Sequence, residues 1–264
     1  MDSVMRPLLC AFVLAYATLA IGQEVRVAAA ADLAPSMPEL KQAFESEHSG
    51  SRITVSIGSS VSLEMQLENG APFDVFLSAD VEQPRKLINS GKAEAGSYFV
   101  YAQGVLALLV PRSHAEIWDL RALTSGQVKK IAIANPQNAP YGRAAVAALK
   151  AAGLYDVLQS KIVEGENVAQ AAQFVISGNA DAGIVSLSAK SLAKERFAAY
   201  PVDAGLYPPL RQAAVLMKPG ADKPLAKEFI DFLKSEKGRT ILQKHGLRPA
   251  VAAGRVAGKR TKKG

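Results

Sequence analysis

The residues from Ile53 to Asp80 combine a strand, a turn, a helix and a second strand in one short stretch, ITVSIGSSVSLEMQLENGAPFDVFLSAD. Alternating β-branched residues over 53–57 predict the first strand, and leucines at helical spacing after Gly58-Ser59-Ser60 predict the helix. A glycine ends this helix, and 74–78 form the second strand. A chain built from such units is expected to fold into mostly parallel sheets covered by helices.

The Gly-Ser-Ser turn places Ser59 and Ser60 at the start of the predicted helix. Unpaired N–H groups and the positive end of the helix dipole make such a start suitable for an anion. Serine is also the ordinary N-cap residue, so this turn alone fits plain helix capping as well as ligand binding. Further strand-to-helix transitions of the same small or hydroxyl-rich kind favour ligand binding. They lie at Ala31-Asp32, at Tyr141-Gly142 together with Asn167-Val168, and at Ser186.

The rest of the chain continues the alternation of strands and helices with short connections. Apolar runs predict strands at 24–31, 105–110, 131–134, 161–163, 182–186 and 213–217. Helical spacing with glycine or proline boundaries predicts helices at 33–48, 84–90, 143–151, 168–177, 224–234 and 237–245. The expected fold class is therefore α/β. In such folds a ligand binds beyond the carboxyl ends of the strands, where helix starts converge.

Residues 1–22 have the features of a secretory signal peptide. Arg6 precedes an apolar core from Leu8 to Ala20, and Ala20-Ile21-Gly22 supplies small residues for cleavage. The core is too short to span a membrane, although an uncleaved N-terminal anchor is the competing interpretation. The only cysteine, Cys10, lies in this leader, so the mature chain is expected to form no disulfide or cysteine-ligated metal site. These features predict export to a bacterial periplasm.

The formal charge of +7 is concentrated at the C-terminus, because residues 254–264 hold five lysines and arginines and no acid. The charges of the leader cancel, so removal of both ends leaves about +2 for the body of the chain. The basic balance therefore does not indicate a nucleic-acid partner. The tail, 251–264, is expected to be disordered.

The sequence lacks the residue patterns of common enzymes and metal sites. Its three histidines, His48, His114 and His245, are scattered and show no metal-ligand spacing. The chain contains no P-loop, no GxGxxG and no GxSxG elbow, and Ser59-Ser60 has no nearby base in the sequence. We therefore expect neither catalysis nor a cofactor.

Longer motifs resemble those of the periplasmic molybdate-binding proteins of ABC importers, over roughly Val25 to Arg248. The shared phrases are VAAAADL, GSS, NGAPFDVFLSAD, IAIANPQNAPYGRAA, GENVAQAAQFV, ADAGIVSLS and KHGLRP. GAPFDVFLSAD and NPQNAPYGRAA together are the most specific part of this signature. The resemblance implies a two-lobed, type II periplasmic binding fold, in which each lobe is a mostly parallel sheet flanked by helices.

The same resemblance implies that the chain crosses between the lobes twice, near 101–104 and near 203–212. Both termini then contribute to lobe one, and the middle of the chain forms lobe two. The expected division is a signal peptide at 1–22, lobe one at 23–102 plus 208–250, lobe two at 103–207 and the basic tail at 251–264.

In the family that the chain resembles, hydroxyls and backbone N–H groups hold a tetrahedral oxyanion without a countercharge. The ligand-binding residues implied for this chain are Ala31, Asp32, Ser59, Ser60, Tyr141, Val168 and Ser186. Asp32 stands where some members have serine, and Ser186 stands where some have tyrosine. A carboxylate facing a dianion would be strongly repelled in a water-poor site. We therefore expect Ala31 and Asp32 to offer backbone N–H groups while the Asp32 carboxylate points away.

The resemblance implies capture of molybdate or tungstate as a whole oxyanion, with no protein ligand on the metal itself. The implied partner is the membrane permease of an ABC importer, and a monomer suffices for solute capture. Two alternatives stay open. The ligand could be another oxyanion, such as sulfate or phosphate, or a small organic acid held by Arg143. The same fold could also serve as an exported hydrolase.

Overall fold

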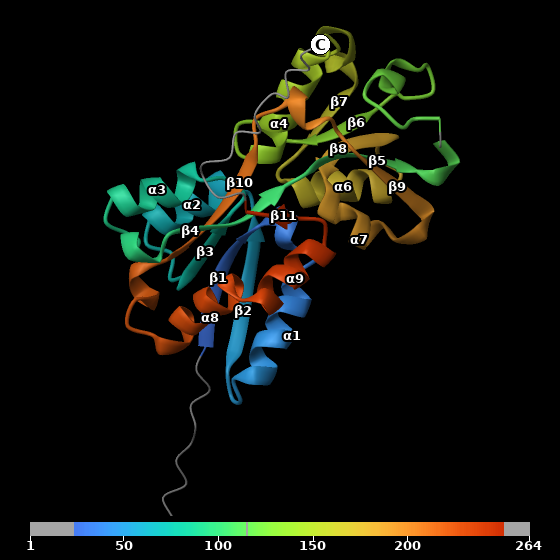
Figure 1. Cartoon of the computed structure of the whole chain (residues 1–264). Helices are drawn as coiled ribbons and strands as arrows, with labels where there is room; N and C mark the ends of the chain where they lie inside the picture. Colours follow the sequence, from blue (N-terminus) through green and yellow to red (C-terminus); the bar gives the residue numbers. More distant parts are fainter. Residues whose placement is uncertain (1–23, 115, 251–264) are drawn as a thin grey trace, which may run out of the picture.

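The computed structural model describes residues 24–114 and 116–250. These residues form two lobes, each built on one β-sheet with helices packed against it, which confirms the expected α/β class. Figure 1 shows one lobe with the blue, teal and red segments of the described chain and another with its green to gold middle part. The predicted signal peptide and basic tail lie outside the described residues. Within the described residues, no helix has the length and apolar character needed to cross a bilayer.

Lobe one is built on a six-stranded sheet with the order β11-β4-β10-β3-β1-β2. Its strands are β1 (Glu24–Ala30), β2 (Arg52–Gly58), β3 (Val75–Ser78), β4 (Phe99–Gly104), β10 (Leu210–Leu216) and β11 (Arg248–Pro249). Its helices are α1 (Met37–Glu47), α2 (Ser60–Glu68), α3 (Glu82–Asn89), α8 (Pro224–Lys234) and α9 (Glu236–Lys244). Strands β1, β2 and β3 are mutually parallel, as the sequence predicts.

The two faces of this sheet carry separate cores, because successive side chains of a strand point to opposite faces. Val25, Val27 and Ala29 of β1 pack with residues of α1, α8 and α9. Ala28 packs on the other face with residues of α2 and α3. Lobe one is thus a three-layer arrangement, and the helices that follow β1 and β2 start at the same edge of the sheet.

Lobe two is built on a five-stranded sheet with the order β7-β6-β8-β5-β9. Its strands are β5 (Leu106–Pro111), β6 (Ile131–Ala134), β7 (Ile162–Gly165), β8 (Ala182–Ser186) and β9 (Phe197–Pro201). Its helices are α4 (Pro140–Ala151), α5 (Tyr155–Leu158), α6 (Val168–Ile176) and α7 (Lys190–Ala193). Here β6 is parallel to β7 and to β8, so α4 and α6 begin at one edge of this sheet too.

The chain passes between the two sheets twice, from β4 to β5 and from β9 to β10. The strand that receives the chain after each crossing runs against its neighbours. Strand β5 is antiparallel to β8 and β9, and β10 is antiparallel to β3 and β4. With these two connections, the sheet edge of lobe one at which α2 begins faces the sheet edge of lobe two at which α4 and α6 begin.

Candidate oxyanion site

Six of the seven predicted site residues line one small cavity between the lobes, with a volume of about 10 Å³. Lobe one contributes Ala30, Ala31, Asp32, Gly58, Ser59, Ser60 and Ala79. Lobe two contributes Ala139, Pro140, Tyr141, Asn167 and Val168. The lobes touch beside this cavity, where the N–H of Val61 donates to the carbonyl oxygen of Asn138 at 3.2 Å. Four strand-to-helix transitions far apart in the sequence therefore meet at one point.

Residues at helix starts from both lobes line this cavity. Ser60 is the first residue of α2, Val168 is the first of α6, and Tyr141 is the second of α4. The N–H groups of a first turn have no carbonyl partner within their own helix. In α6 the side chain of Asn167 accepts from Ala169 and Gln170 at 3.1 Å each, and Val168 precedes both. These starts also carry the positive ends of their helix dipoles.

The two serines of the Gly-Ser-Ser turn have different roles. The Ser59 hydroxyl caps α2: it accepts from the N–H of Ser62 at 3.2 Å and donates to the Ser62 hydroxyl at 2.7 Å. The Ser60 hydroxyl accepts from the N–H of Ala79 at 2.9 Å. That bond occupies the Ser60 oxygen as an acceptor and leaves its hydrogen for a further partner. The capping interpretation thus describes the Ser59 side chain, and Ser60 retains a free hydroxyl donor.

Gly142 allows α4 to start close to the end of β6. A Cβ built at this position would collide with the carbonyl oxygen of Ala134, the last residue of β6. The sequence predicted this helix from residue 143, whereas it begins at Pro140 because proline suits a first helical turn. The earlier start places Tyr141 in the first turn of α4, where its N–H group has no partner within the helix, and Tyr141 lines the cavity.

Among the residues that the structure describes, no lysine or arginine lines the cavity, and Asp32 is the one carboxylate that does. The Asp32 side chain is hydrogen-bonded within the protein: its Oδ2 accepts from the Tyr141 hydroxyl at 3.1 Å and from the Gln212 amide. Burial raises the pKa of Asp32 from 3.8 to about 6, against a lowering by these two hydrogen bonds. Burial also raises the pKa of the Tyr141 hydroxyl, which therefore stays protonated as a donor.

Ser186 is the predicted site residue that does not line the cavity. Its hydroxyl donates to the Tyr141 hydroxyl at 3.2 Å and shares a 2.9 Å hydrogen bond with the Ser188 hydroxyl. It also accepts from the N–H of Ser188 at 3.3 Å, which caps the short 3₁₀ turn after β8. In this closed arrangement Ser186 supports Tyr141 instead of reaching the cavity.

Arg143 is engaged in an ion pair that joins the lobes. Its guanidinium contacts Asp80 of lobe one at 2.9 Å, and the Asp80 side chain is only 13% exposed. Asp80 in turn accepts from the N–H groups of Glu82 and Gln83 at the start of α3. Arg143, which the sequence suggested as the partner of a small organic acid, is therefore already paired with Asp80.

Sequence reasoning missed Gln212 and Ser188. Gln212 is fully buried and donates to Asp32 and Tyr141, and the Ser188 hydroxyl donates to the Asp32 carbonyl oxygen at 2.7 Å. A signal for Gln212 exists, because it is a lone amide at the edge of the apolar run AAVLM and a buried amide needs partners. The partners themselves, Asp32 and Tyr141, are 180 and 71 positions away.

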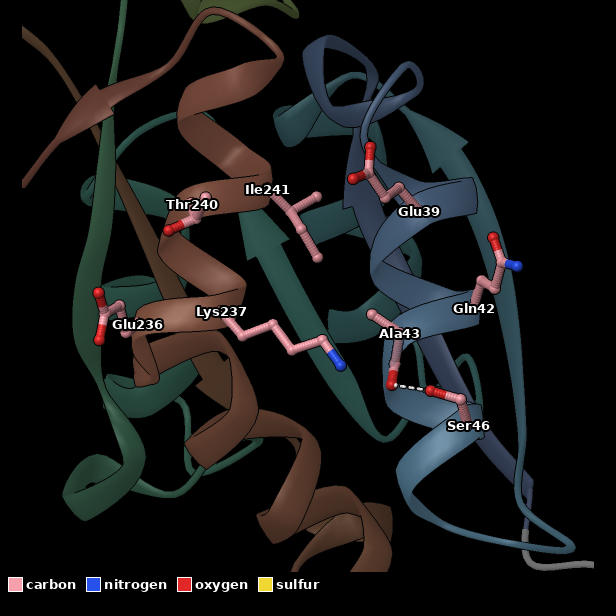
Figure 2. Close-up of a pocket in the computed structure, with 8 residues that line it drawn as sticks. All are labelled: Glu39, Gln42, Ala43, Ser46, Glu236, Lys237, Thr240 and Ile241. Atoms are coloured by element: carbon pink, nitrogen blue, oxygen red, sulfur yellow. Dashed lines mark hydrogen bonds between the residues drawn. The ribbon is translucent and has the colours of Figure 1, made fainter.

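A larger hollow, of about 690 Å³, lies elsewhere on lobe one. Figure 2 shows it as a groove between α1 and α9, with Lys237 extending from α9 toward α1. Lys237 forms an ion pair with Glu47 at 2.5 Å. The groove has no convergent donors like those of the interlobe cavity. Across residues 24–114 and 116–250, no group of three histidine, cysteine or acidic side chains is arranged to hold a metal ion.

Residues 25–248 match the family of bacterial extracellular solute-binding proteins. The chain belongs to this family. Its members are solute-binding proteins, and the match covers both lobes and every residue of the cavity.

Individual members resemble the chain over most of its length. The molybdate-binding protein ModA of Rhodobacter capsulatus is 38% identical over 236 residues, which cover 89% of this chain and 92% of that relative. The solved Azotobacter vinelandii periplasmic molybdate-binding protein matches with a TM-score of 0.79 at 35% identity, over 86% of this chain and 100% of that one. These likenesses confirm the resemblance drawn from the motifs. The sulfate-binding protein SubI from Mycobacterium tuberculosis (TM-score 0.73, 14% identity, 88% of each chain) shares the fold alone.

Proposed function

We propose that this chain captures molybdate, or the similar tungstate, between its lobes and delivers it to the membrane permease of an ABC importer. The observation that carries the proposal is the convergence of uncharged donors from both lobes on one small cavity without a basic side chain. A fully deprotonated tetrahedral oxyanion needs only donors, and helix starts provide them. The likeness to two molybdate-binding proteins above 30% identity supports this ligand class.

The donors suffice for tight binding without a countercharge. We assign the ligand contacts to the backbone N–H groups of Ala31, Asp32, Tyr141 and Val168 and to the hydroxyl of Ser60. Each charge-assisted hydrogen bond contributes roughly 1.5–3 kcal/mol. About five such bonds outweigh the entropy cost of association and allow submicromolar affinity. Ser59 and Ser186 would act on the site indirectly, by capping α2 and by supporting Tyr141.

Closure of the lobes would be the state that the permease recognises. A ligand that contacts both lobes stabilises the closed form by its differential affinity for that form. A monomer in the periplasm suffices for this role, which needs no cofactor and no catalytic step. It also requires no protein ligand on the molybdenum or tungsten atom, because every contact reaches an oxygen.

Isothermal titration of the exported chain tests this function. We expect submicromolar binding of molybdate or tungstate, with one ligand per chain. Sulfate and phosphate are the competing oxyanions, and each should displace molybdate only at far higher concentration. Phosphate carries a proton at neutral pH, so its hydroxyl needs an acceptor in a cavity lined mainly by donors. Folded protein that gives no heat with molybdate or tungstate contradicts the proposal, and preferred binding of sulfate would identify the alternative ligand.

Replacement of Ser60 with alanine should weaken molybdate binding by about 1–3 kcal/mol, because one hydroxyl donor is lost. Ser59→Ala provides the matched comparison, since the Ser59 hydroxyl is used within α2. We expect Ser59→Ala to reduce the free energy of unfolding by about 1 kcal/mol through loss of the cap, with a smaller change in affinity. Titration and thermal unfolding of both variants measure the two effects. Equal affinities for Ser60→Ala and the unmodified chain would show that the hydroxyl does not contact the ligand.

A further inference from the structure

The Asp32 carboxyl lies at the centre of a buried hydrogen-bonded cluster behind the cavity. Asp32 is 2% exposed, and its Oδ2 accepts from the Tyr141 hydroxyl and the Gln212 amide. Its Oδ1 is buried and has no hydrogen-bond partner among the described residues. The cluster also contains Ser186 and Ser188, and Ser188 returns a hydrogen bond to the carbonyl oxygen of Asp32. We call these five residues the Asp32 cluster.

The Asp32 cluster joins the two lobes. Asp32 and Gln212 belong to lobe one, whereas Tyr141, Ser186 and Ser188 belong to lobe two. The bonds from Tyr141 to the Asp32 carboxyl and from Ser188 to the Asp32 carbonyl therefore exist only while the lobes are together. Separation of the lobes exposes the carboxyl to water, and closure buries it again.

No cation balances this carboxyl. Among residues 24–114 and 116–250, no ion pair includes Asp32. The elements around it carry tyrosines, one acid and two arginines, Arg143 of α4 and Arg211 of β10, and neither arginine forms an ion pair with Asp32. Tyr101 of β4 and Tyr141 of α4 both interact electrostatically with Asp32, and Tyr207 lies next to Tyr141. The acid is Asp80, which is already paired with Arg143.

The cluster accommodates both protonation states of Asp32 without moving a heavy atom. When the carboxyl is ionised, the Tyr141 hydroxyl donates to it. When the carboxyl is protonated, it donates to the Tyr141 hydroxyl. The hydroxyls then rotate, so that Tyr141 donates to Ser186, Ser186 donates to Ser188, and Ser188 donates to the Asp32 carbonyl oxygen. Hydroxyl hydrogens rotate freely to suit their partners. Protonation thus removes a buried negative charge and keeps these hydrogen bonds.

We propose that the Asp32 carboxyl takes up one proton from solvent when the lobes close on a dianion, so that oxyanion affinity is linked to pH through this residue. The inference rests on the proposed function. Free protein with ionised Asp32, one dianion and one proton combine to give closed protein with a neutral Asp32 carboxyl and the bound dianion. An ionised Asp32 would instead be a like charge held beside the dianion in a water-poor cleft.

The direction of the pH effect follows from the state that holds the proton. In the open protein the carboxyl faces water, and the ordinary pKa of an aspartate is 3.8. Burial raises the pKa to about 6 in the closed lobes, and a bound dianion raises it further. Affinity is therefore greatest below the open-state pKa. It falls as the pH rises through the closed-state pKa, by at most about tenfold per pH unit for one proton.

Titration of molybdate into the full exported chain at pH 5.5, 6.5 and 7.5 tests this linkage, in pairs of non-oxyanion buffers with different ionisation enthalpies. We expect the unmodified chain to take up a measurable fraction of a proton per ligand at pH 6.5 and to lose affinity toward pH 7.5. Asp32→Asn keeps an oxygen for Tyr141 and Gln212 and cannot titrate. It should show no proton uptake, a flat affinity profile after correction for the ligand's own protonation, and tighter binding than the unmodified chain at pH 7.5.

Tyr141→Phe is the second variant, because it removes the hydroxyl donor that favours ionised Asp32 and keeps the Tyr141 N–H group. It should extend proton uptake to higher pH, and it decides the question if Asp32→Asn fails to fold. Binding with a buffer-independent enthalpy in the unmodified chain, or an unchanged proton profile in Tyr141→Phe, overturns the inference and leaves the proposed function standing. Absence of molybdate binding at every pH contradicts the proposed function itself.

Discussion

Replacement of Gly142 with alanine is expected to lower the free energy of unfolding by about 3 kcal/mol and to weaken molybdate binding by about 30- to 150-fold. The added Cβ would collide with the carbonyl oxygen of Ala134, which is backbone and cannot rotate away. The start of α4 must therefore move off the end of β6. That shift withdraws the Tyr141 N–H group from the cavity, since Tyr141 immediately precedes Gly142.

Gly126→Ala is the matched control in the same lobe, because a Cβ at that position would meet no atom within 4 Å. We expect its stability to change by less than about 1 kcal/mol and its affinity to stay the same. Chemical denaturation and molybdate titration of both variants measure the two quantities. A Gly142→Ala protein as stable and as active in binding as Gly126→Ala would show that α4 has room to shift without consequence.

Replacement of Val168 with proline should weaken molybdate binding by at least about 2–3 kcal/mol while the fold is kept. Val168 is the first residue of α6, a position that proline favours, because the N–H it lacks has no partner within the helix. The preceding residue, Asn167, already has the extended backbone that proline requires before it (φ −144°, ψ 175°). The substitution therefore removes one proposed ligand donor and places a ring carbon where its hydrogen was.

Two controls separate this effect from changes in packing or helix stability. Glu236→Pro makes the same change at the first residue of α9, which lies away from the cavity and follows an extended Ser235. Val168→Ala removes buried side-chain volume and keeps the N–H group. We expect both controls to bind molybdate within a few fold of the unmodified chain. A Val168→Pro affinity equal to theirs would remove this N–H group from the set of ligand contacts.

The sequence predicted the elements whose signals are local. The strands at Ile131–Ala134 and Ala182–Ser186 and the helix at Pro224–Lys234 have the predicted bounds. Strands β4 and β9 were not predicted, since each is stabilised by pairing with a strand distant in sequence. Strand β4 pairs with β10, more than a hundred residues later, and no local pattern records that pairing.

The same distinction applies to the site. The transitions that hold Asp32, Ser60, Tyr141 and Val168 were found because small or hydroxyl residues there mark helix starts, and the family resemblance then singled out Ser60, Tyr141 and Val168. The structure brings these starts together. Gln212 was missed because its importance depends on contact with Asp32, 180 positions away. The role of the Asp32 carboxyl likewise depends on which lobe supplies its partners. The Gln212–Asp32 contact forms when lobe one is assembled, and the Tyr141–Asp32 contact forms when the two lobes come together.

The strand order of lobe one also determines when its sheet can be completed as the chain is synthesised. In the order β11-β4-β10-β3-β1-β2, only β10 connects β4 and β11 to the other three strands. During synthesis, all strands of lobe two are therefore made before β10, the strand that completes the lobe-one sheet. A polypeptide that ends before Leu210 would lack the strand that joins the two parts of this sheet, and with it Gln212, which holds the Asp32 carboxyl.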